Sequence, residues 1–322
     1  MRVLVTGGAG FIGSNFVRRV LDGSLNEISR VTVVDKLTYA GNMANLQMLD
    51  ERSFEFIHGD ICDPSLINRI TKSIDAIVNF AAESHVDRSI AGAEDFVRTN
   101  ILGTQTLLDA ALRNDVKTFL QISTDEVYGT IMEGSWNENF PLQPNSPYSA
   151  SKASADLIAL AYHRTHKLDV RITRCSNNYG PYQNPEKVIP LFITNLIQGK
   201  KIPIYGNGKN IRDWLHVDDH CSGIFLTLRK GAPGEIYNLG GGKELTNLDL
   251  GRLLLMRFGR DESWIDWVPD RKGHDFRYCV DYTKSLQSLG YRPTYDFNSA
   301  IDEVIAWYKA NEEWWRGRKV SN

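Results

Sequence analysis

The chain has 322 residues, of which 42% are hydrophobic and 24% charged, and its formal net charge is −2. This balance is that of an ordinary globular protein and excludes a largely disordered chain. The near-neutral charge, without any dense run of Lys or Arg, argues against a DNA-binding or membrane-surface protein whose affinity depends on a basic patch. A small-molecule partner fits better.

The four cysteines lie far apart and form no CxxC pair, so neither a zinc site nor a disulfide framework is expected. The first residues, MRVLVTGG, lead directly into a strand and a glycine turn, without the apolar segment of a signal peptide. No later run is long enough to span a bilayer. We therefore expect reduced thiols, no metal and a cytoplasmic location.

Short β-branched runs alternate with helical patterns over the first 180 residues. The predicted strands cover residues 3–6, 31–35, 54–58, 74–80, 118–123 and 169–174. Helical patterns cover residues 12–22, a stretch from 64, 94–114 and 149–166. This βαβ rhythm predicts an α/β fold with a Rossmann doubly wound parallel sheet over residues 1–180. Shorter, proline-punctuated elements follow, so a smaller mixed α/β C-terminal domain is predicted over 181–322, with the chain crossing between the two parts more than once.

Three glycines directly after the first strand, Gly7, Gly10 and Gly13, have the spacing GxxGxxG. A strand before them and a helix after them form the context of a dinucleotide-binding fingerprint. Gly7 can turn the chain tightly, Gly10 lets backbone N–H groups approach a pyrophosphate, and Gly13 lets the helix pack closely on the sheet. The alternative is a mere tight turn between strand and helix.

The second strand ends at Asp35, whose carboxylate can accept hydrogen bonds from both ribose hydroxyls of a dinucleotide. A 2′-phosphate would meet like charge there, so NAD is favoured over NADP, although the neighbouring Lys36 weakens this inference. After the third strand, Asp60 and Ile61 are placed to meet the adenine edge. Asp60 by itself could equally be a loop or capping residue.

Tyr148 and Lys152 form a YxxxK pair, a spacing that projects both side chains from one face of a helix. The lysine ammonium, together with a positive nicotinamide ring, is expected to lower the pKa of the phenol and make it a usable base at neutral pH. Such pairs occur on many helices. Combined with the glycine fingerprint and with Ser123-Thr124 at a strand end, however, the pair makes the whole chain resemble the extended short-chain dehydrogenase/reductase family.

Two adjacent acids, Asp125 and Glu126, follow Thr124 at this strand end, where family members that only move a hydride usually have small residues. Elimination of water across C5 and C6 of a hexose requires a base for the C5 proton and an acid for the departing hydroxyl. Adjacent carboxylates repel each other's charge, so one can stay protonated while the other ionises. The alternative is a solvated acidic turn.

The resemblance then narrows to the 4,6-dehydratases that act on dTDP-D-glucose. The matching motifs cover residues 35–42, 81–89, 123–129, 148–152 and 212–219. The resemblance implies that Tyr148 takes the 4-hydroxyl proton, assisted by Thr124, while NAD takes the C4 hydride. It further implies that Glu126 removes the C5 proton, that Asp125 protonates the C6 oxygen, and that the hydride returns to C6 to give a 4-keto-6-deoxy sugar nucleotide.

The family pattern also implies binding residues at matching positions. For the cofactor these are Gly7, Gly10, Phe11, Ile12, Gly13, Asp35, Lys36, Leu37, Thr38, Asp60, Ile61, Ala81, Ala82, Ser84, Thr99, Tyr148, Lys152 and Asn178. For the substrate they are Ser84, Thr124, Asp125, Glu126, Asn177, Lys187, Val188, Pro203, Ile204, Tyr205, Arg212, Asn247, Arg271 and His274.

Chemistry agrees for the two arginines of this set. Arg212 and Arg271 can each make bidentate hydrogen bonds to a pyrophosphate, although a single arginine in a loop is more often a solvated surface group. Lys272 stands where many members of the family that the chain resembles have proline, and this departure leaves Arg271 and His274 in place. His85 is expected to be structural or cofactor-adjacent, because the implied mechanism already has its proton carriers.

Other functions of the same superfamily compete with this interpretation. A UDP-sugar 4-epimerase has no use for the acid pair, because its hydride returns to the same carbon. A GDP-mannose dehydratase typically has the glutamate without the aspartate and usually prefers NADP. A non-catalytic NAD-sensing protein would be expected to have lost Tyr148, Lys152 or an acid. Thymine and uracil differ by one methyl group, so the sequence does not separate dTDP-sugars from UDP-sugars.

The helices predicted over 94–114 and 149–166 carry apolar residues on more than one face. Excess apolar surface of this kind indicates burial against a partner. In the family that the chain resembles, the equivalent helices pair across a two-fold axis. A homodimer is therefore expected.

Overall fold

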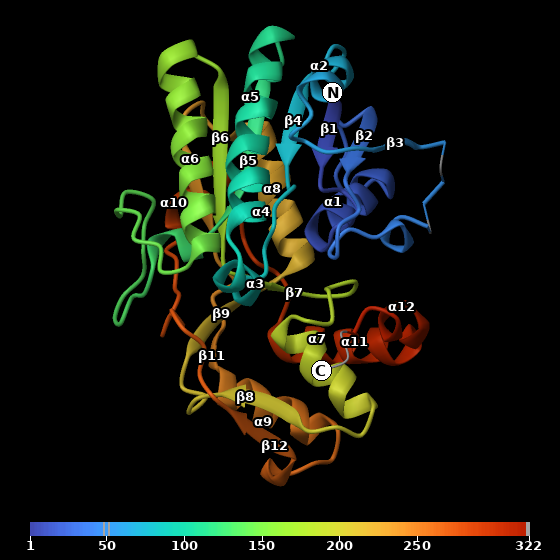
Figure 1. Ribbon diagram of the computed structural model, residues 1–322, viewed down its shortest axis with the longest axis vertical. Helices are drawn as coiled ribbons and strands as arrows, with labels where there is room; N and C mark the ends of the chain where they lie inside the picture. Colours follow the sequence, from blue (N-terminus) through green and yellow to red (C-terminus); the bar gives the residue numbers. More distant parts are fainter. Residues whose placement is uncertain (48, 51, 320–322) are drawn as a thin grey trace.

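The computed structural model describes residues 1–47, 49–50 and 52–319. A parallel sheet of seven strands, in the order β10-β6-β5-β4-β1-β2-β3, forms the centre of its larger part (Figure 1). The strands are β1 (Arg2–Thr6), β2 (Arg30–Asp35), β3 (Phe54–His58), β4 (Ala76–Asn79), β5 (Thr118–Thr124), β6 (Asp169–Cys175) and β10 (Ile236–Leu239). The predicted doubly wound parallel sheet is thus confirmed.

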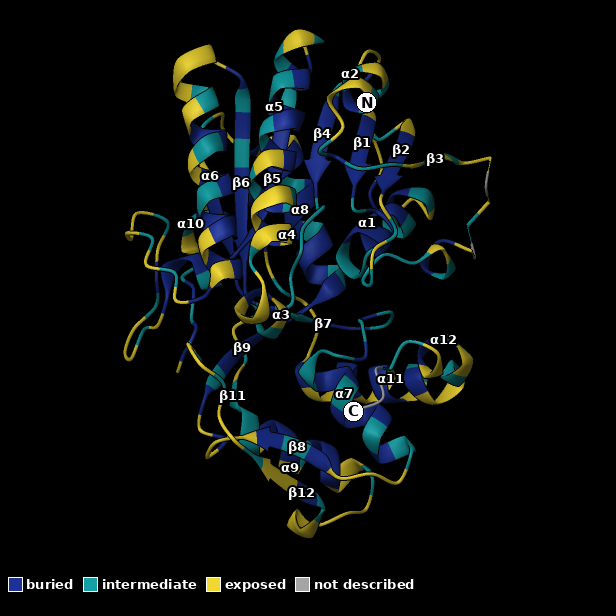
Figure 2. Cartoon of the chain, viewed as in Figure 1, coloured by how far each residue is buried: buried dark blue, intermediate teal, exposed yellow. Residues whose placement is uncertain are grey.

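Helices cover both faces of this sheet. They are α1 (Phe11–Leu21), α2 (Pro64–Ile70), α5 (Thr104–Arg113), α6 (Pro147–His166) and α8 (Val217–Lys230). Side chains of β1 alternate between the two layers: Val3 and Val5 pack with α1 and α8, whereas Leu4 packs with α2, α5 and α6. Because both faces are covered, the inner strands β1, β2 and β4 are buried, as Figure 2 shows by their dark blue colour, and their sequences are rich in apolar residues. The edge strand β3 is only partly buried.

The helix predicted over 94–114 forms, but it is not uniform. It consists of α4 (Glu94–Phe96), a π-helical segment η2 (Val97–Gly103) and α5. Single π-helical segments inside α-helices occur often at functional sites. Asn100 of this segment donates its side-chain N–H to the Glu83 carbonyl at 3.0 Å and accepts from the Glu83 N–H at 2.9 Å. The π segment thereby fixes the chain that follows β4.

Helix α6 begins with strong start signals. Pro147 stands in its first turn, and Ser146 forms a capping box with Ser149, because each side chain accepts from the backbone N–H of the other residue. The helix therefore begins two residues before the predicted start at residue 149. This fixed start sets the direction in which Tyr148 and Lys152 leave the helix.

The smaller part contains two short sheets. One joins β7 (Asn177–Tyr179), β9 (Ile211–His216) and β11 (Glu244–Thr246), and the other pairs β8 (Ile202–Tyr205) with β12 (Ile265–Val268). Its core gathers apolar side chains from α7 (Val188–Ile197), α9 (Asn247–Arg257), α11 (Phe297–Ala310) and α12 (Glu312–Arg316). The remaining helices are α3 (Val86–Ala91), α10 (Thr283–Leu289) and the 3₁₀ turns η1 (Met43–Asn45), η3 (Asp125–Tyr128) and η4 (Glu262–Trp264).

Strand β10 and helix α8 pack in the layers of the large sheet, although both follow residue 181 in the sequence. The domain boundary at residue 180 stays a prediction. Among the described residues, none of the helices combines the length and the apolar character needed to cross a membrane.

Candidate active site

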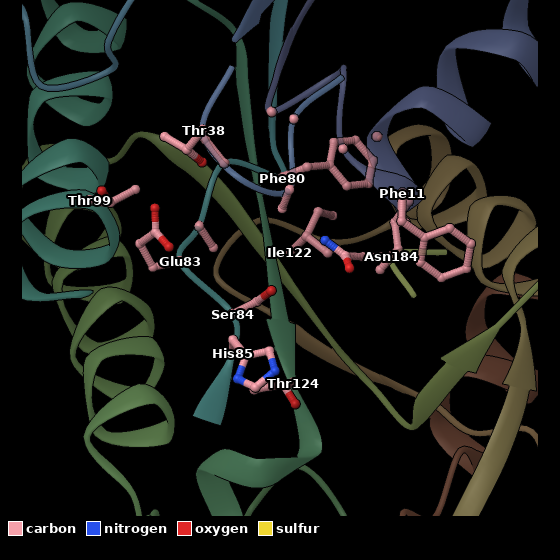
Figure 3. A pocket seen from close by; sticks show the side chains of 18 of the residues that line it. Phe11, Thr38, Phe80, Glu83, Ser84, His85, Thr99, Ile122, Thr124 and Asn184 are labelled. Atoms are coloured by element: carbon pink, nitrogen blue, oxygen red, sulfur yellow. The ribbon is translucent and has the colours of Figure 1, made fainter. Parts of the chain in front are cut away.

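A large cavity lies at the carboxyl ends of β1, β2, β4, β5 and β6. The strand order reverses here, because β2 and β3 lie on one side of β1 and β4, β5 and β6 on the other. In open parallel sheets, ligands bind at such a switch point. Figure 3 places Ser84, His85 and Thr124 at one end of the cavity and Thr38 at the other.

The glycine-rich loop closes one side of this cavity. Helix α1 starts after Gly10 without a side-chain cap, so its first N–H groups can bind an anion. Gly7 has a φ of +66°, and a Cβ atom there would lie 2.7 Å from the Ala81 Cα atom. A Cβ atom on Gly13 would lie 2.3 Å from the Gly7 carbonyl oxygen. The loop therefore has the shape that a pyrophosphate requires, and a mere tight turn would not need both close approaches.

Asp35, at the end of β2, is anchored by two backbone donors. Its carboxylate accepts from the Ala9 N–H at 2.9 Å and from the Leu37 N–H at 2.8 Å, and one lone pair on each oxygen is left for a ligand hydroxyl. Burial raises the pKa of Asp35, and the two backbone bonds oppose this. Lys36 pairs with Asp60 at 2.9 Å. Because this ammonium is already paired with a carboxylate, it contributes little positive charge to bind a 2′-phosphate, and the residues fit NAD.

The cavity brings together nearly all predicted cofactor residues. Leu37 alone does not line it. Its backbone has a φ of +54°, and its side chain packs on the apolar cluster around α1. The positive φ and this packing turn Leu37 away from the cavity, while its N–H still orients Asp35.

Tyr148 and Lys152 both line the cavity from α6. The Lys152 ammonium donates to the Ile122 carbonyl oxygen at 2.6 Å, and burial lowers the pKa of this amine. Burial, followed by the charge of Glu126, raises the pKa of Tyr148 well above its usual value. In the protein alone, the pKa of Tyr148 is therefore shifted upward, opposite to the lowering that we expected from Lys152. A positive nicotinamide ring would act in the lowering direction.

Asp125 and Glu126 occupy the turn η3, directly after β5. Asp125 is only 1% exposed, which excludes a solvated acidic turn. Burial, then the charges of Glu126 and Asp213, raises the pKa of Asp125 well above its usual value. Burial also raises the pKa of Glu126, but the nearby cations Arg271 and Lys187 oppose that rise. The pair is therefore asymmetric: its surroundings favour the protonated form of Asp125, whereas nearby cations favour the ionised form of Glu126.

Of the predicted substrate residues, Ser84, Asn177 and Lys187 line the cavity together with Thr124, Asp125 and Glu126. The Lys187 ammonium donates to the Ser84 carbonyl oxygen at 2.9 Å. The cavity walls do not include the others: Val188, Pro203, Ile204, Tyr205, Arg212, Asn247, Arg271 and His274. Their substrate contacts stay a prediction.

The structure still places some of these outer residues near the acids. Arg212 is 5% exposed, unlike a surface arginine, and its guanidinium donates to the carbonyl oxygens of Ile211 at 2.7 Å and Asp275 at 3.0 Å. Both Arg212 and Arg271 act on the pKa of Glu126. Ile204, in contrast, is 1% exposed and packs in the core of the smaller part, so only its backbone is left for a ligand.

Several cavity residues were not predicted as site residues. Tyr39, Glu83 and His85 lie inside the motifs 35–42 and 81–89 that resemble the family, and this position was the sequence signal that could have identified them. Gln183, Asn184 and Glu186 come from the loop between β7 and α7, where no motif marks them. His85 and Glu186 both line the cavity, and the His85 Nε2 atom lies 3.6 Å from a carboxylate oxygen of Glu186. Its position agrees with a structural or cofactor-adjacent role.

Comparison with known proteins adds the following. The family model of GDP-mannose 4,6 dehydratase matches residues 4–304. The dTDP-glucose 4,6-dehydratase of Actinoplanes sp. is 56% identical, over 98% of this chain and 100% of the relative. That of Streptomyces antibioticus is 56% identical over 99% of this chain and 96% of its own. The crystal structure of the dTDP-glucose 4,6-dehydratase DesIV from Streptomyces venezuelae, solved with NAD bound, is 56% identical and superposes with a TM-score of 0.98 over 99% of this chain and 100% of its own.

Proposed function

This chain belongs to the dTDP-glucose 4,6-dehydratase family, and on that premise we propose that it converts dTDP-D-glucose to dTDP-4-keto-6-deoxy-D-glucose with bound NAD. One observation carries the proposal: a buried acid, Asp125, stands beside a half-buried acid, Glu126, in the same cavity as Tyr148. An enzyme that only moved a hydride would need the tyrosine but not the pair.

The first half of the reaction oxidises C4. Tyr148 takes the proton of the 4-hydroxyl group, and Thr124, which lines the same cavity, is placed to hold the 4-oxygen. NAD, which the glycine loop and Asp35 would hold, would supply a hydride acceptor for C4 and a hydride donor for C6. Lys152 lines the same cavity from the helix that carries Tyr148. The resulting C4 ketone makes the neighbouring C5 proton acidic.

The second half removes water. Glu126, kept ionisable by Arg271 and Lys187, takes the C5 proton, and Asp125, kept protonated by burial, gives its proton to the C6 oxygen as the C5–C6 double bond forms. One proton is taken and one is given, so the pair as a whole is unchanged in charge. Reduction at C6 and protonation at C5 then complete the product.

We further propose that the outer cations hold the substrate pyrophosphate. Arg271 and Arg212 lie near enough to Glu126 to act on its pKa, and neither is a freely solvated group. The nucleotide would extend from there along the residues that line no part of the cavity: Val188, Pro203, Ile204, Tyr205, Asn247 and His274. In this arrangement residues 1–180 bind the cofactor and residues 181–322 bind the nucleotide.

We also propose a homodimer formed by the helices α4-η2-α5 and α6. Val97, Leu102 and Leu157 are 52%, 45% and 57% exposed, and the two helical runs pack against each other, so these apolar side chains lie on adjacent helices. Burial against a second copy would remove this surface from water.

A cytoplasmic location is supported by the four cysteines, none of which forms a disulfide in the structure.

The test is mass spectrometry of dTDP-D-glucose incubated with the purified protein in heavy water. We expect loss of one water, gain of one deuterium at C5, and no consumption of added reduced cofactor. An unchanged mass with NAD bound would refute the assigned substrate. UDP- and GDP-hexoses would then be tested: loss of water would show another dehydratase, and an unchanged mass with a changed C4 configuration by NMR would show a 4-epimerase.

A further inference from the structure

The C-terminal helices α11 and α12 are linked by hydrogen bonds to two separate segments that border the NAD cavity. Figure 1 shows these red helices below α1, with the loop after β7 between them. The first segment is the glycine-rich loop, which they reach through η1. The second is the cavity loop, residues 180–187, between β7 and α7.

The first contact runs from Trp314 to the glycine-rich loop. The Trp314 indole N–H donates to the Asn45 side-chain oxygen at 2.9 Å, and the Asn45 side-chain N–H donates to the Ala9 carbonyl oxygen at 2.8 Å. Asn45 is only 4% exposed. The N–H of Ala9 also donates a hydrogen bond to the Asp35 carboxylate. Trp314 therefore fixes, through one buried amide, the peptide that leads into Gly10 and the first turn of α1.

The second contact holds the cavity loop. The Tyr308 hydroxyl donates to the Gln183 carbonyl oxygen at 2.5 Å, and Gln183 lines the NAD cavity. The ring of Tyr182 lies 4.1 Å from the Arg18 guanidinium carbon and 4.5 Å from the Trp307 ring. Tyr182 has a φ of +65°, a conformation that an aromatic residue rarely adopts. Such a backbone persists only where its surroundings hold it.

The two contacts form one network. The Arg18 guanidinium, which lies against Tyr182, also donates to the Asn45 carbonyl oxygen at 2.9 Å. Trp314 packs edge-on against Tyr182 with ring centroids 5.7 Å apart. Movement of α11 and α12 would therefore release both borders of the cavity together.

We propose that α11 and α12 act as a clasp that keeps NAD bound through the reaction, with Trp314 and Tyr308 as positioning residues. The proposal rests on the proposed function, because an internal redox cycle fails if the reduced cofactor leaves before C6 is reduced. Neither residue touches the reacting atoms. Their effect is exerted through Asn45, which binds the glycine-rich loop, and through Gln183, which lines the cavity.

The experiment compares Trp314→Phe with wild type in the full-length holoenzyme. Phenylalanine keeps an aromatic ring but removes the indole donor, which leaves the buried Asn45 oxygen without this partner. After dilution, NAD released into the filtrate is measured over time without any substrate. We expect dissociation at least about fivefold faster, the factor that corresponds to one lost hydrogen bond to a buried group. During turnover, reduced cofactor should appear in the filtrate, and added NAD should restore activity.

The matched control is Trp267→Phe, the same substitution at a 52% exposed position on β12, which should leave NAD release unchanged. Tyr308→Phe, which removes only one hydroxyl group, should also speed release and covers the case in which the Trp314 variant does not fold. Release at the wild-type rate from folded Trp314→Phe or folded Tyr308→Phe would overturn the clasp. Because the release assay uses no sugar nucleotide, its outcome is independent of whether wild type dehydrates dTDP-D-glucose.

Discussion

Replacing Asp156 by Asn should destabilise the protein strongly, because it leaves two buried cations without their carboxylate. Asp156 pairs with Arg174 at 2.9 Å, and the two side chains are 0% and 2% exposed. Lys152 lies one turn earlier on the same helix and is also buried. Removing one partner of a buried ion pair costs about 3–5 kcal/mol, which for a chain of this size lowers Tm by roughly 4–7 °C.

Thermal unfolding followed by circular dichroism would measure this change. Glu262→Gln is the control, since it breaks a pair with Arg252 whose side chains are 58% and 48% exposed, and such pairs contribute about 1 kcal/mol or less. Adding Arg174→Met to Asp156→Asn should recover part of the loss, because the uncompensated charge is then gone. A Tm for Asp156→Asn within about 2 °C of wild type would refute the reasoning.

The remaining predictions concern catalysis, cofactor binding and pH. Asp125→Asn should slow loss of water at least about 100-fold and let reduced cofactor accumulate on the enzyme, seen by its absorbance; an unchanged rate would remove Asp125 as the acid. Because burial raises the pKa of Glu126, kcat/KM should fall as pH drops through a value above that of a free glutamate, and a limb at or below the ordinary value would contradict this. Gly13→Ala should abolish NAD binding in calorimetry, since its Cβ would lie 2.3 Å from a loop carbonyl oxygen, whereas Gly92→Ala, with open space around it, should bind normally. Burial lowers the pKa of His220 to about 3, so the unfolded chain binds one more proton than the folded one below the ordinary histidine pKa. Between about pH 6 and 4, stability should therefore fall by about 1.4 kcal/mol more per pH unit in wild type than in His220→Gln, as measured by urea unfolding; equal slopes would contradict it.

Much of the fold was predictable because the strands of the large sheet are short runs of apolar and β-branched residues between turn signals. A strand such as β3 (Phe54–His58) coincides with its predicted range, since its residues form a short run between turn signals. The π-helical segment Val97–Gly103 was not predictable, because one wider turn barely changes the spacing of apolar residues. Strand β10 (Ile236–Leu239) was missed because it joins the large sheet from the part of the chain after residue 181, where the βαβ rhythm has ended.

Among the site residues too, those in local motifs were predictable, and those that depend on distant parts of the fold were not. The glycine loop and the Tyr148–Lys152 pair are local motifs, so their spacing alone fixes their geometry, and they line the cavity. Residues such as Asn247 and His274 depend on how the smaller part folds against the sheet, which no local spacing encodes. Asn184 and Glu186 were missed for the same reason: a loop brings them to the cavity only after β7 and β9 have paired.

The turn η3 places Asp125 and Glu126 at consecutive positions of one short segment. The two acids therefore have no separate scaffolds, and no loop had to be added to bring them together. Changing an enzyme of this architecture between reactions that need the pair and reactions that do not would require changing two neighbouring codons, while the sheet, the cofactor loop and the tyrosine stay in place. The reaction catalysed within this superfamily can thus change through a few local substitutions that leave the overall fold unchanged.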